Sequence, residues 1–248
     1  NTIPSEAEFS AIAVTGVNPA NISSVNSVLA VLSASATDSR AEVQSVVETY
    51  VAILNGADGV ANGGLSLTAT QYQNIGLANI TNTAQANLLS SIIDSSTTSE
   101  VDTYAELQTL ANIVARLAVV ASGGSASPPL TPAELALSGI TGVTASNLSS
   151  VLASIATTDD SGSGIDSLAK LQGAVDTGIA NARDASQAII SSYNGSNTTP
   201  TLAHFENTGV TGVTSANIAS VNTFIAVMSA GDTDAQSEVQ ALVDAHAK

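Results

Sequence analysis

The chain repeats itself, and this feature constrains its fold more than any other. Residues 1–49 align without a gap with residues 197–245, and 25 of these 49 positions are identical. Two weaker copies lie between them. Self-similarity at a regular spacing is typical of repeat architectures, so we expect several small units rather than one large domain.

Each copy opens with the same pattern for the start of a helix. A hydroxyl residue is followed three positions later by Glu, Gln or His, and then by a large apolar residue. The hydroxyl residues are Ser5, Thr68, Thr131 and Thr201, spaced by 63, 63 and 70 residues. In the first three copies the pattern predicts a capping box, in which the two side chains satisfy backbone N–H groups.

A second landmark follows this short helix. The residues at this position are Gly16, Asn79, Gly142 and Gly212. Asn is the ordinary residue that most often replaces Gly where φ is positive. We therefore expect a left-handed backbone conformation at all four positions, with a second helix after each of them.

A third landmark opens the last helix of each copy. An Asp is followed six residues later by Gln, and the residue before the Gln starts an apolar stripe with helical spacing. The acidic residues are Asp38, Asp102, Asp166 and Asp234, and the amides are Gln44, Gln108, Gln172 and Gln240. Asp is favourable at a helix N-terminus, both as a cap and against the helix dipole.

These patterns predict an all-α protein with no significant β-sheet, built as a tandem array of four three-helix modules. The expected modules are residues 1–64, 65–129, 130–199 and 200–248, and we refer to these segments as repeats 1 to 4. The fourth is the shortest, so we expect it to be incomplete or completed by a partner. In repeat 3 the last helix either runs from Asp166 to about Tyr193 or breaks near Gly178, because Gly is a poor helix residue.

The recurring Gln has two interpretations. It is either a ligand-binding position on every module or a hydrogen-bonding residue that holds each module together. We favour the second, because the same fold poses the same hydrogen-bonding demand four times and a buried amide must be satisfied.

Composition excludes several classes of partner. Five Lys and Arg against 21 Asp and Glu give a net charge of −16, which argues against nucleic acid and against an anionic membrane surface. The absence of Cys excludes disulfides, thiolate catalysis and Cys-based zinc sites. No run of 18 apolar residues exists, so membrane insertion is not expected. The composition is typical of secreted bacterial surface proteins.

The chain shows no convincing catalytic motif, and no cofactor is expected. His204 and His246 are predicted to be surface residues, His204 at a helix start. The best metal candidate is a calcium site at Asp159, Asp160 and Asp166 in a Gly-rich loop, with a solvated loop as the alternative. Five asparagines lie in N-glycosylation motifs: Asn21, Asn79, Asn147, Asn194 and Asn197.

The run from Thr131 to Asn147, followed by Asp166 to Gln172, resembles helical tandem repeats of very large, acidic, exported bacterial surface proteins of the adhesin type. A weaker likeness exists to the three-helix albumin-binding (GA) modules of such proteins. The resemblance implies a stalk or adhesive segment on the cell surface, without catalysis. The alternatives are a subunit of a self-assembling filament or surface layer, with identical subunits as partners, and a binding module for a host protein or glycan.

Overall fold

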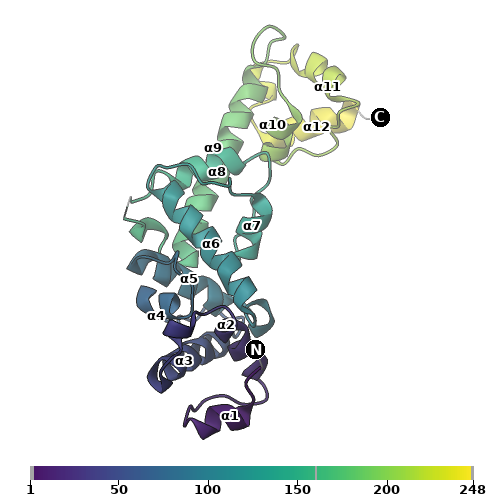
Figure 1. Cartoon of the computed structure of the whole chain (residues 1–248). Helices are drawn as coiled ribbons and strands as arrows, with labels where there is room; N and C mark the ends of the chain where they lie inside the picture. The colour runs from purple at the N-terminus through teal and green to yellow at the C-terminus, as the bar shows by residue number, and fades with distance from the viewer. Residues whose placement is uncertain (1–2, 160, 247–248) are drawn as a thin grey trace. The chain divides into compact units, whose positions relative to one another are not determined.

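The computed structural model describes residues 3–159 and 161–246. Within these residues the chain forms twelve α-helices and four short 3-10 helices, and no β-strand (Figure 1). The all-α prediction is therefore confirmed. The α-helices are α1 (Glu6–Ala11), α2 (Ile22–Leu29), α3 (Arg40–Gly56), α4 (Ala69–Asn74), α5 (Thr83–Ser95), α6 (Tyr104–Ala121), α7 (Pro132–Leu137), α8 (Leu148–Ile155), α9 (Leu168–Ser192), α10 (Leu202–Thr208), α11 (Ile218–Ile225) and α12 (Gln236–His246).

The elements follow the same order in each repeat: a short helix, a second helix, a 3-10 turn and a third helix. The short helices begin as predicted, with capping boxes at Ser5, Thr68 and Thr131. Thr201 forms a fourth capping box in which His204 takes the place of Glu or Gln. The 3-10 turns were not predicted; they are η1 (Ala34–Ala36), η2 (Thr98–Glu100), η3 (Ser163–Ile165) and η4 (Ala230–Asp232).

Contacts between the helices group the chain into two compact units. The first comprises the described residues of 1–141 and 156–172, and the second those of 142–155 and 173–248. Repeat 3 thus contributes to both units, and its last helix, α9, contributes residues to each.

The core of the first unit is shared between consecutive repeats. Helix α3 of repeat 1 packs against α4 and α5 of repeat 2. The hydroxyl of the buried Tyr50 on α3 donates to the carbonyl of Val101, at 3.1 Å. Tyr72 on α4 is also buried and shares a hydrogen bond with Ser90. Burial raises the pKa of both tyrosines, so both phenols keep their protons and can donate.

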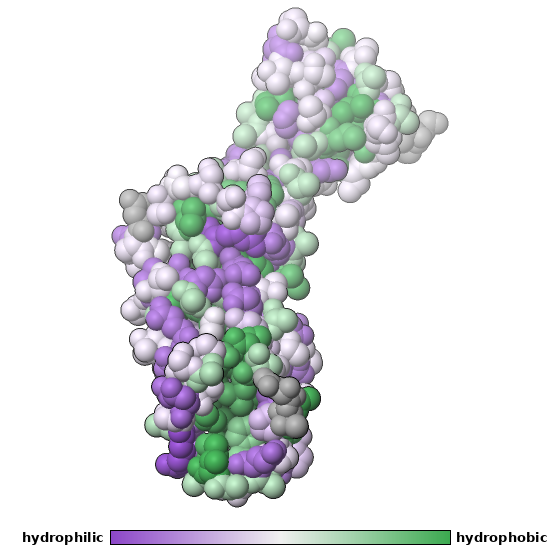
Figure 2. Space-filling model, viewed as in Figure 1, coloured by the Kyte–Doolittle hydropathy of each residue, from purple (hydrophilic) through white to green (hydrophobic). Residues whose placement is uncertain are grey.

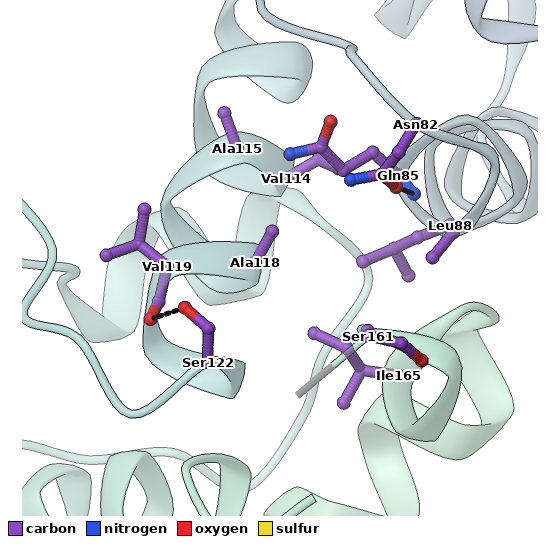
Figure 3. Close-up of a pocket in the computed structure, with 12 residues that line it drawn as sticks. Asn82, Gln85, Leu88, Val114, Ala115, Ala118, Val119, Ser122, Ser161 and Ile165 are labelled. Carbon is purple, nitrogen blue, oxygen red and sulfur yellow. Dashed lines mark hydrogen bonds between the residues drawn. The ribbon is translucent and has the colours of Figure 1, made fainter. Parts of the chain in front are cut away.

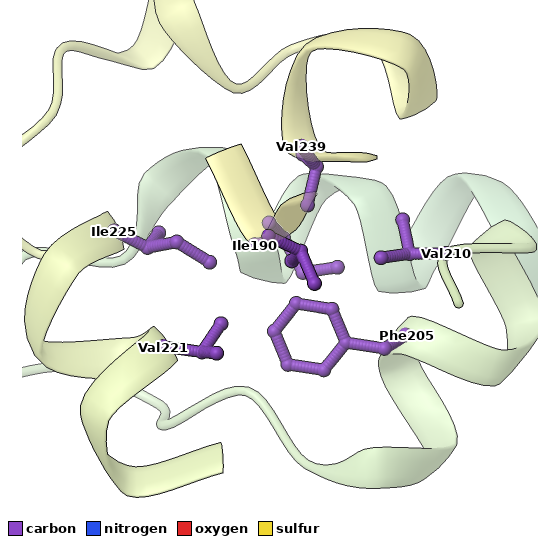
Figure 4. Close-up of a cluster of buried hydrophobic side chains, with 7 residues drawn as sticks. Ile190, Phe205, Val210, Val221, Ile225 and Val239 are labelled. Carbon is purple, nitrogen blue, oxygen red and sulfur yellow. The ribbon is translucent and has the colours of Figure 1, made fainter. Parts of the chain in front are cut away.

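The second unit has its own hydrophobic cluster, shown in Figure 4. Side chains from α9, α11 and α12 converge on the ring of Phe205, which comes from α10. The buried members of the cluster are Ile190, Phe205, Val210, Val221, Ile225, Val239 and Val243. The last turns of α9 therefore complete the core of the repeat that follows them.

Helix α9 is continuous over its 25 residues, a length of roughly 38 Å, and does not break at Gly178. A Cβ atom added to Gly178 would lie 2.5 Å from the Cα of Val151 on α8. The glycine thus lets the two helix backbones approach closely. This packing offsets the low helix propensity of Gly, which explains why the expected alternative of a break is wrong.

Candidate functional site: the turns and joints of the repeats

The short first helix ends in the same way in all four repeats. The backbone N–H of a buried apolar residue donates to the carbonyl five positions earlier, as in a Schellman motif. These bonds join Val14 to Phe9, Leu77 to Tyr72, Ile140 to Leu135 and Val210 to Phe205, at 2.9–3.1 Å. The residue before each donor has a positive φ; these residues are Ala13, Gly76, Gly139 and Gly209. Sequence reasoning missed this position, although Gly at three of its four copies was a usable signal.

The predicted left-handed position after this motif exists in three repeats. Gly16, Gly142 and Gly212 have φ of +93°, +81° and +84°. Asn79 does not have a positive φ, so the prediction for repeat 2 was wrong. In repeat 2 the Asn79 side chain bonds instead to Asn112 on α6, at 2.9 Å.

The recurring Gln side chain holds this turn in three repeats. Gln44 accepts from the N–H of Thr15 at 2.8 Å and donates to the carbonyl of the same residue at 3.1 Å. The pairs Gln172–Thr141 and Gln240–Thr211 form the same two bonds. We call this pair of bonds the amide clamp. The clamp supports the structural interpretation of Gln, although these side chains are only half-buried rather than buried.

Repeat 2 lacks the amide clamp. Gln108 accepts from the hydroxyl of Tyr104 at 2.7 Å and donates to the side chain of Asn112 at 2.9 Å. It reaches Asn79 only at 3.4 Å. The turn in this repeat follows a different backbone path because Asn79 does not adopt the left-handed conformation of the equivalent glycines.

In three repeats an Asn side chain also bonds to the turn. The sequence patterns did not predict a structural role for this residue. Asn21 donates to the carbonyl of Gly16 and accepts from the N–H of Asn18, both at 2.8 Å. Asn147 and Asn217 make the equivalent bonds.

Asn21 and Asn147 lie in glycosylation motifs, but both are buried and their amide nitrogens are engaged. Of the five motif asparagines, only Asn194 and Asn197 lie in an exposed connector.

The recurring Asp is not the N-cap of the third helix. The caps of α3 and α6 are the next residues, Ser39 and Thr103, each in a capping box with a Glu three positions later. Ser167 takes the same position before α9 and accepts from the N–H of Lys170. The predicted cap role of Asp38, Asp102 and Asp166 is thus wrong, because a hydroxyl followed by Glu satisfies two backbone donors at once. Asp234 likewise precedes Ala235, whose N–H donates to Glu238.

The joint between repeats 1 and 2 and the joint between repeats 2 and 3 share a hydrogen bond. Ser27 on α2 accepts from the N–H of Tyr104, the first residue of α6, at 3.0 Å. Ser91 on α5 accepts from the N–H of Leu168, the first residue of α9, also at 3.0 Å. Both pairs are 77 residues apart in sequence. Each bond satisfies a free N–H at a helix start with a side chain from the preceding repeat.

Repeats 2 and 3 are also joined by an ion pair. Arg116 on α6 contacts the carboxylate of Glu134 on α7 at 2.6 Å, and both side chains are largely buried. Arg116, and then the cap residue Thr131, hold the pKa of Glu134 below its ordinary value. The same guanidinium donates to the carbonyls of Pro128 and Pro129, so one side chain ties the connector to both helices.

Two of the three calcium candidates lie in the described part of the chain, and each binds a different partner. Asp159 accepts from the backbone and the hydroxyl of Ser161, and Asp166 pairs with Lys170 at 2.7 Å. Asp160 lies outside the described residues. Among the residues that the structure describes, no group of three His, Asp or Glu side chains is arranged to hold a metal ion.

A hollow of about 260 Å³ lies where η3 meets α5 and α6 (Figure 3). Its floor is aliphatic, and Asn82, Gln85, Ser122 and Ser161 supply its polar side chains. None of the described residues that line it carries a charge. These residues therefore supply neither a general acid and base nor a nucleophile paired with a base.

No described helix is both long and apolar enough to cross a membrane. The geometry that recurs among the repeats lies in their turns and in the contacts between them. The candidate functional surfaces are those on which one repeat packs against the next. Comparison of the chain with models of protein families, with characterised proteins and with solved structures gives no match.

Proposed function

We propose that the chain is a structural segment of an extracellular bacterial surface protein, a stalk or fibre in which three-helix modules stack in tandem. The observation that carries this proposal is the repeated joint. Ser27 and Ser91 make the same bond to the next repeat over the same sequence separation. When each repeat contacts the next one in the same way, the repeats stack in a row, as in other repeat proteins.

Two further observations support this proposal. In three of the four repeats the recurring polar side chains, including Gln44 and Asn21, bond to the backbone of their own repeat. The net charge of −16 opposes non-specific association, which suits a segment surrounded by solvent. The surface location itself rests on composition and on the resemblance to exported repeat proteins.

Antibody labelling of the source organism tests the proposal. Antibodies raised against the purified chain are applied to intact cells and, in parallel, to permeabilised cells. We expect equal labelling in both samples, and loss of the signal when intact cells are first treated with protease. Labelling that requires permeabilisation would place the repeats inside the cell and overturn the proposed surface role.

A further inference from the structure

Repeat 1 carries an apolar groove of about 910 Å³ formed by α1, α2 and the segment that follows them. Phe9, Ile12 and Leu29 belong to its apolar lining, and Glu8, Asn26 and Thr37 are among its polar residues. Ile12 is 50% exposed, and Ile3, which also lines the groove, is 79% exposed. Figure 2 shows hydrophobic residues gathered over the part of the first unit where α1 and α2 lie.

The equivalent surface of repeat 4 is covered by helix α9. Residues 1–49 match residues 197–245, so Phe9, Leu29 and Thr37 correspond to Phe205, Ile225 and Thr233. Ile190 of α9 packs on Phe205 and Ile225 in the core of the second unit (Figure 4). Gln187 of α9 donates to the carbonyl of Thr233 at 2.6 Å.

The exposure of matching residues reflects this difference in cover. Ile12 in repeat 1 corresponds to Thr208 in repeat 4, which is only 5% exposed. Leu29 is half-buried, whereas the matching Ile225 is 1% exposed. Repeat 1 therefore presents a larger side chain on a more open surface, where a covering helix would remove apolar area from water.

The same kind of cover occurs within the first unit. Helix α3 packs on the first two helices of repeat 2, and α6 packs on α7 of repeat 3. In each joint the third helix of one repeat thus packs on the first helix of the next, and α3 and α9 also pack on the second. The groove of repeat 1 is the matching surface without such a helix among the described residues.

We propose that this groove binds the last turns of an α9-type helix that belongs to another repeat of the same kind. The occupant is an amphipathic helix with an aliphatic residue at the position of Ile190 and an amide donor at that of Gln187. The inference rests on the proposed stacking of modules, and it names the surface and the partner through which stacking continues.

A graft tests the fit within the full chain. Residues 166–196 are fused directly before Asn1, so that the added helix stands to repeat 1 as α9 stands to repeat 4. Hydrogen exchange is measured by mass spectrometry at the amides of α1 and α2. We expect exchange slowed roughly ten-fold or more, because docking must be broken before these helices open.

Three substitutions provide the controls. Ile190→Asp in the grafted segment, or Ile12→Asp in the groove, is expected to abolish the added protection, whereas Val60→Asp, at an exposed site outside the groove, leaves it intact. Equal exchange with and without the graft overturns the proposal, as does protection that survives the graft's Ile190→Asp.

The unmodified chain is measured over a range of concentrations. In a second copy Ile190 of α9 is already buried in the core of the second unit, so protection that rises with concentration would assign the groove to another surface of that copy and overturn the proposed occupant. These measurements use purified protein. The result for the groove is therefore independent of whether antibodies find the repeats on the cell surface.

Discussion

At the scale of single residues, one backbone conformation departs from what its side chain favours. Among the described residues other than glycine, only Ala13 has a positive φ, of 56°. The matching residues in the other repeats are glycines, which adopt this conformation without a steric penalty. The left-handed conformation costs a residue with a Cβ atom on the order of 1–2 kcal/mol.

Ala13→Gly should therefore stabilise the chain by about 0.5–1 kcal/mol, since relief of strain exceeds the added entropy of the unfolded glycine. Thermal or urea unfolding of the variant measures the difference. The matched control is Ala30→Gly, at an exposed residue with φ of −64° after α2. That variant should lose stability, and a gain of equal size in both variants would contradict the strain argument.

We expect the stability of repeat 4 to fall at acidic pH because of His204. Burial lowers the pKa of this histidine, and its neutral Nδ1 accepts the N–H of Thr201 at 3.0 Å. Because the unfolded state binds the proton more readily, this contribution to stability is present above the ordinary pKa of about 6.5 and is lost as pH falls below it. His204→Gln, which copies Gln71 of repeat 2, should flatten the dependence of unfolding on pH between 7 and 5. An unchanged slope would show that the cap does not titrate.

The amide clamp gives a third residue-scale prediction. Gln44→Leu removes both partners of Thr15 in the clamp and should cost about 1 kcal/mol. Gln108→Leu should cost less, because the Tyr104 hydroxyl keeps a second acceptor in the carbonyl of Gly76, and the partner Asn112 is exposed to water. Equilibrium unfolding of the two variants makes the comparison. Equal losses would mean that the clamp adds nothing beyond an ordinary side-chain contact.

Much of this residue-scale structure was predictable from local spacing. A hydroxyl followed three positions later by Glu or Gln specifies a helix start without help from distant residues, so Ser5, Thr68 and Thr131 were assigned correctly. The conformation of Asn79 was not predictable in this way. Its backbone and side chain depend on Asn112 on another helix, which no local pattern reveals.

At the scale of helices, the close approach of a neighbouring helix explains why one glycine inside α9 is needed there and another is not. Gly173 and Gly178 both lie inside α9, but only Gly178 faces another helix. An added Cβ at Gly178 would meet backbone atoms of Ser150 and Val151 at 2.5–2.9 Å, whereas nothing lies within 4 Å of one at Gly173. The continuity of α9 was not predictable because it depends on this contact with α8.

Gly178→Ala should therefore destabilise the second unit by roughly 1–3 kcal/mol, because the two helices must move apart. Gly173→Ala should stabilise it by up to about 1 kcal/mol through helix propensity alone. Circular dichroism during thermal unfolding compares the pair. Stabilisation by both substitutions would show that α8 and α9 do not pack closely at Gly178.

At the scale of the whole molecule, sequence repeats and compact units do not coincide. The internal similarity indicated four copies, but contacts group the chain into two units, with repeat 3 divided between them. The physical reason is that the third helix of a repeat completes the core of the next one, as Ile190 does for Phe205. Spacing in the sequence fixes where helices begin, and it does not show which neighbour shares their buried side.

Because each of the two units has its own core, a mutation in one core should destabilise mainly the unit that contains it. Phe205→Ala removes the ring at the centre of the second unit's cluster and should cost that unit about 3–5 kcal/mol. Hydrogen exchange should then accelerate in α10 to α12 and in the last turns of α9, while α3 to α6 stay protected, because opening can be confined to one cooperative unit. Tyr72→Ala, at a buried ring of the first unit, should produce the opposite pattern. Faster exchange throughout the chain in both variants would mean that the two units unfold as one, with α9 transmitting the loss from either core to the other.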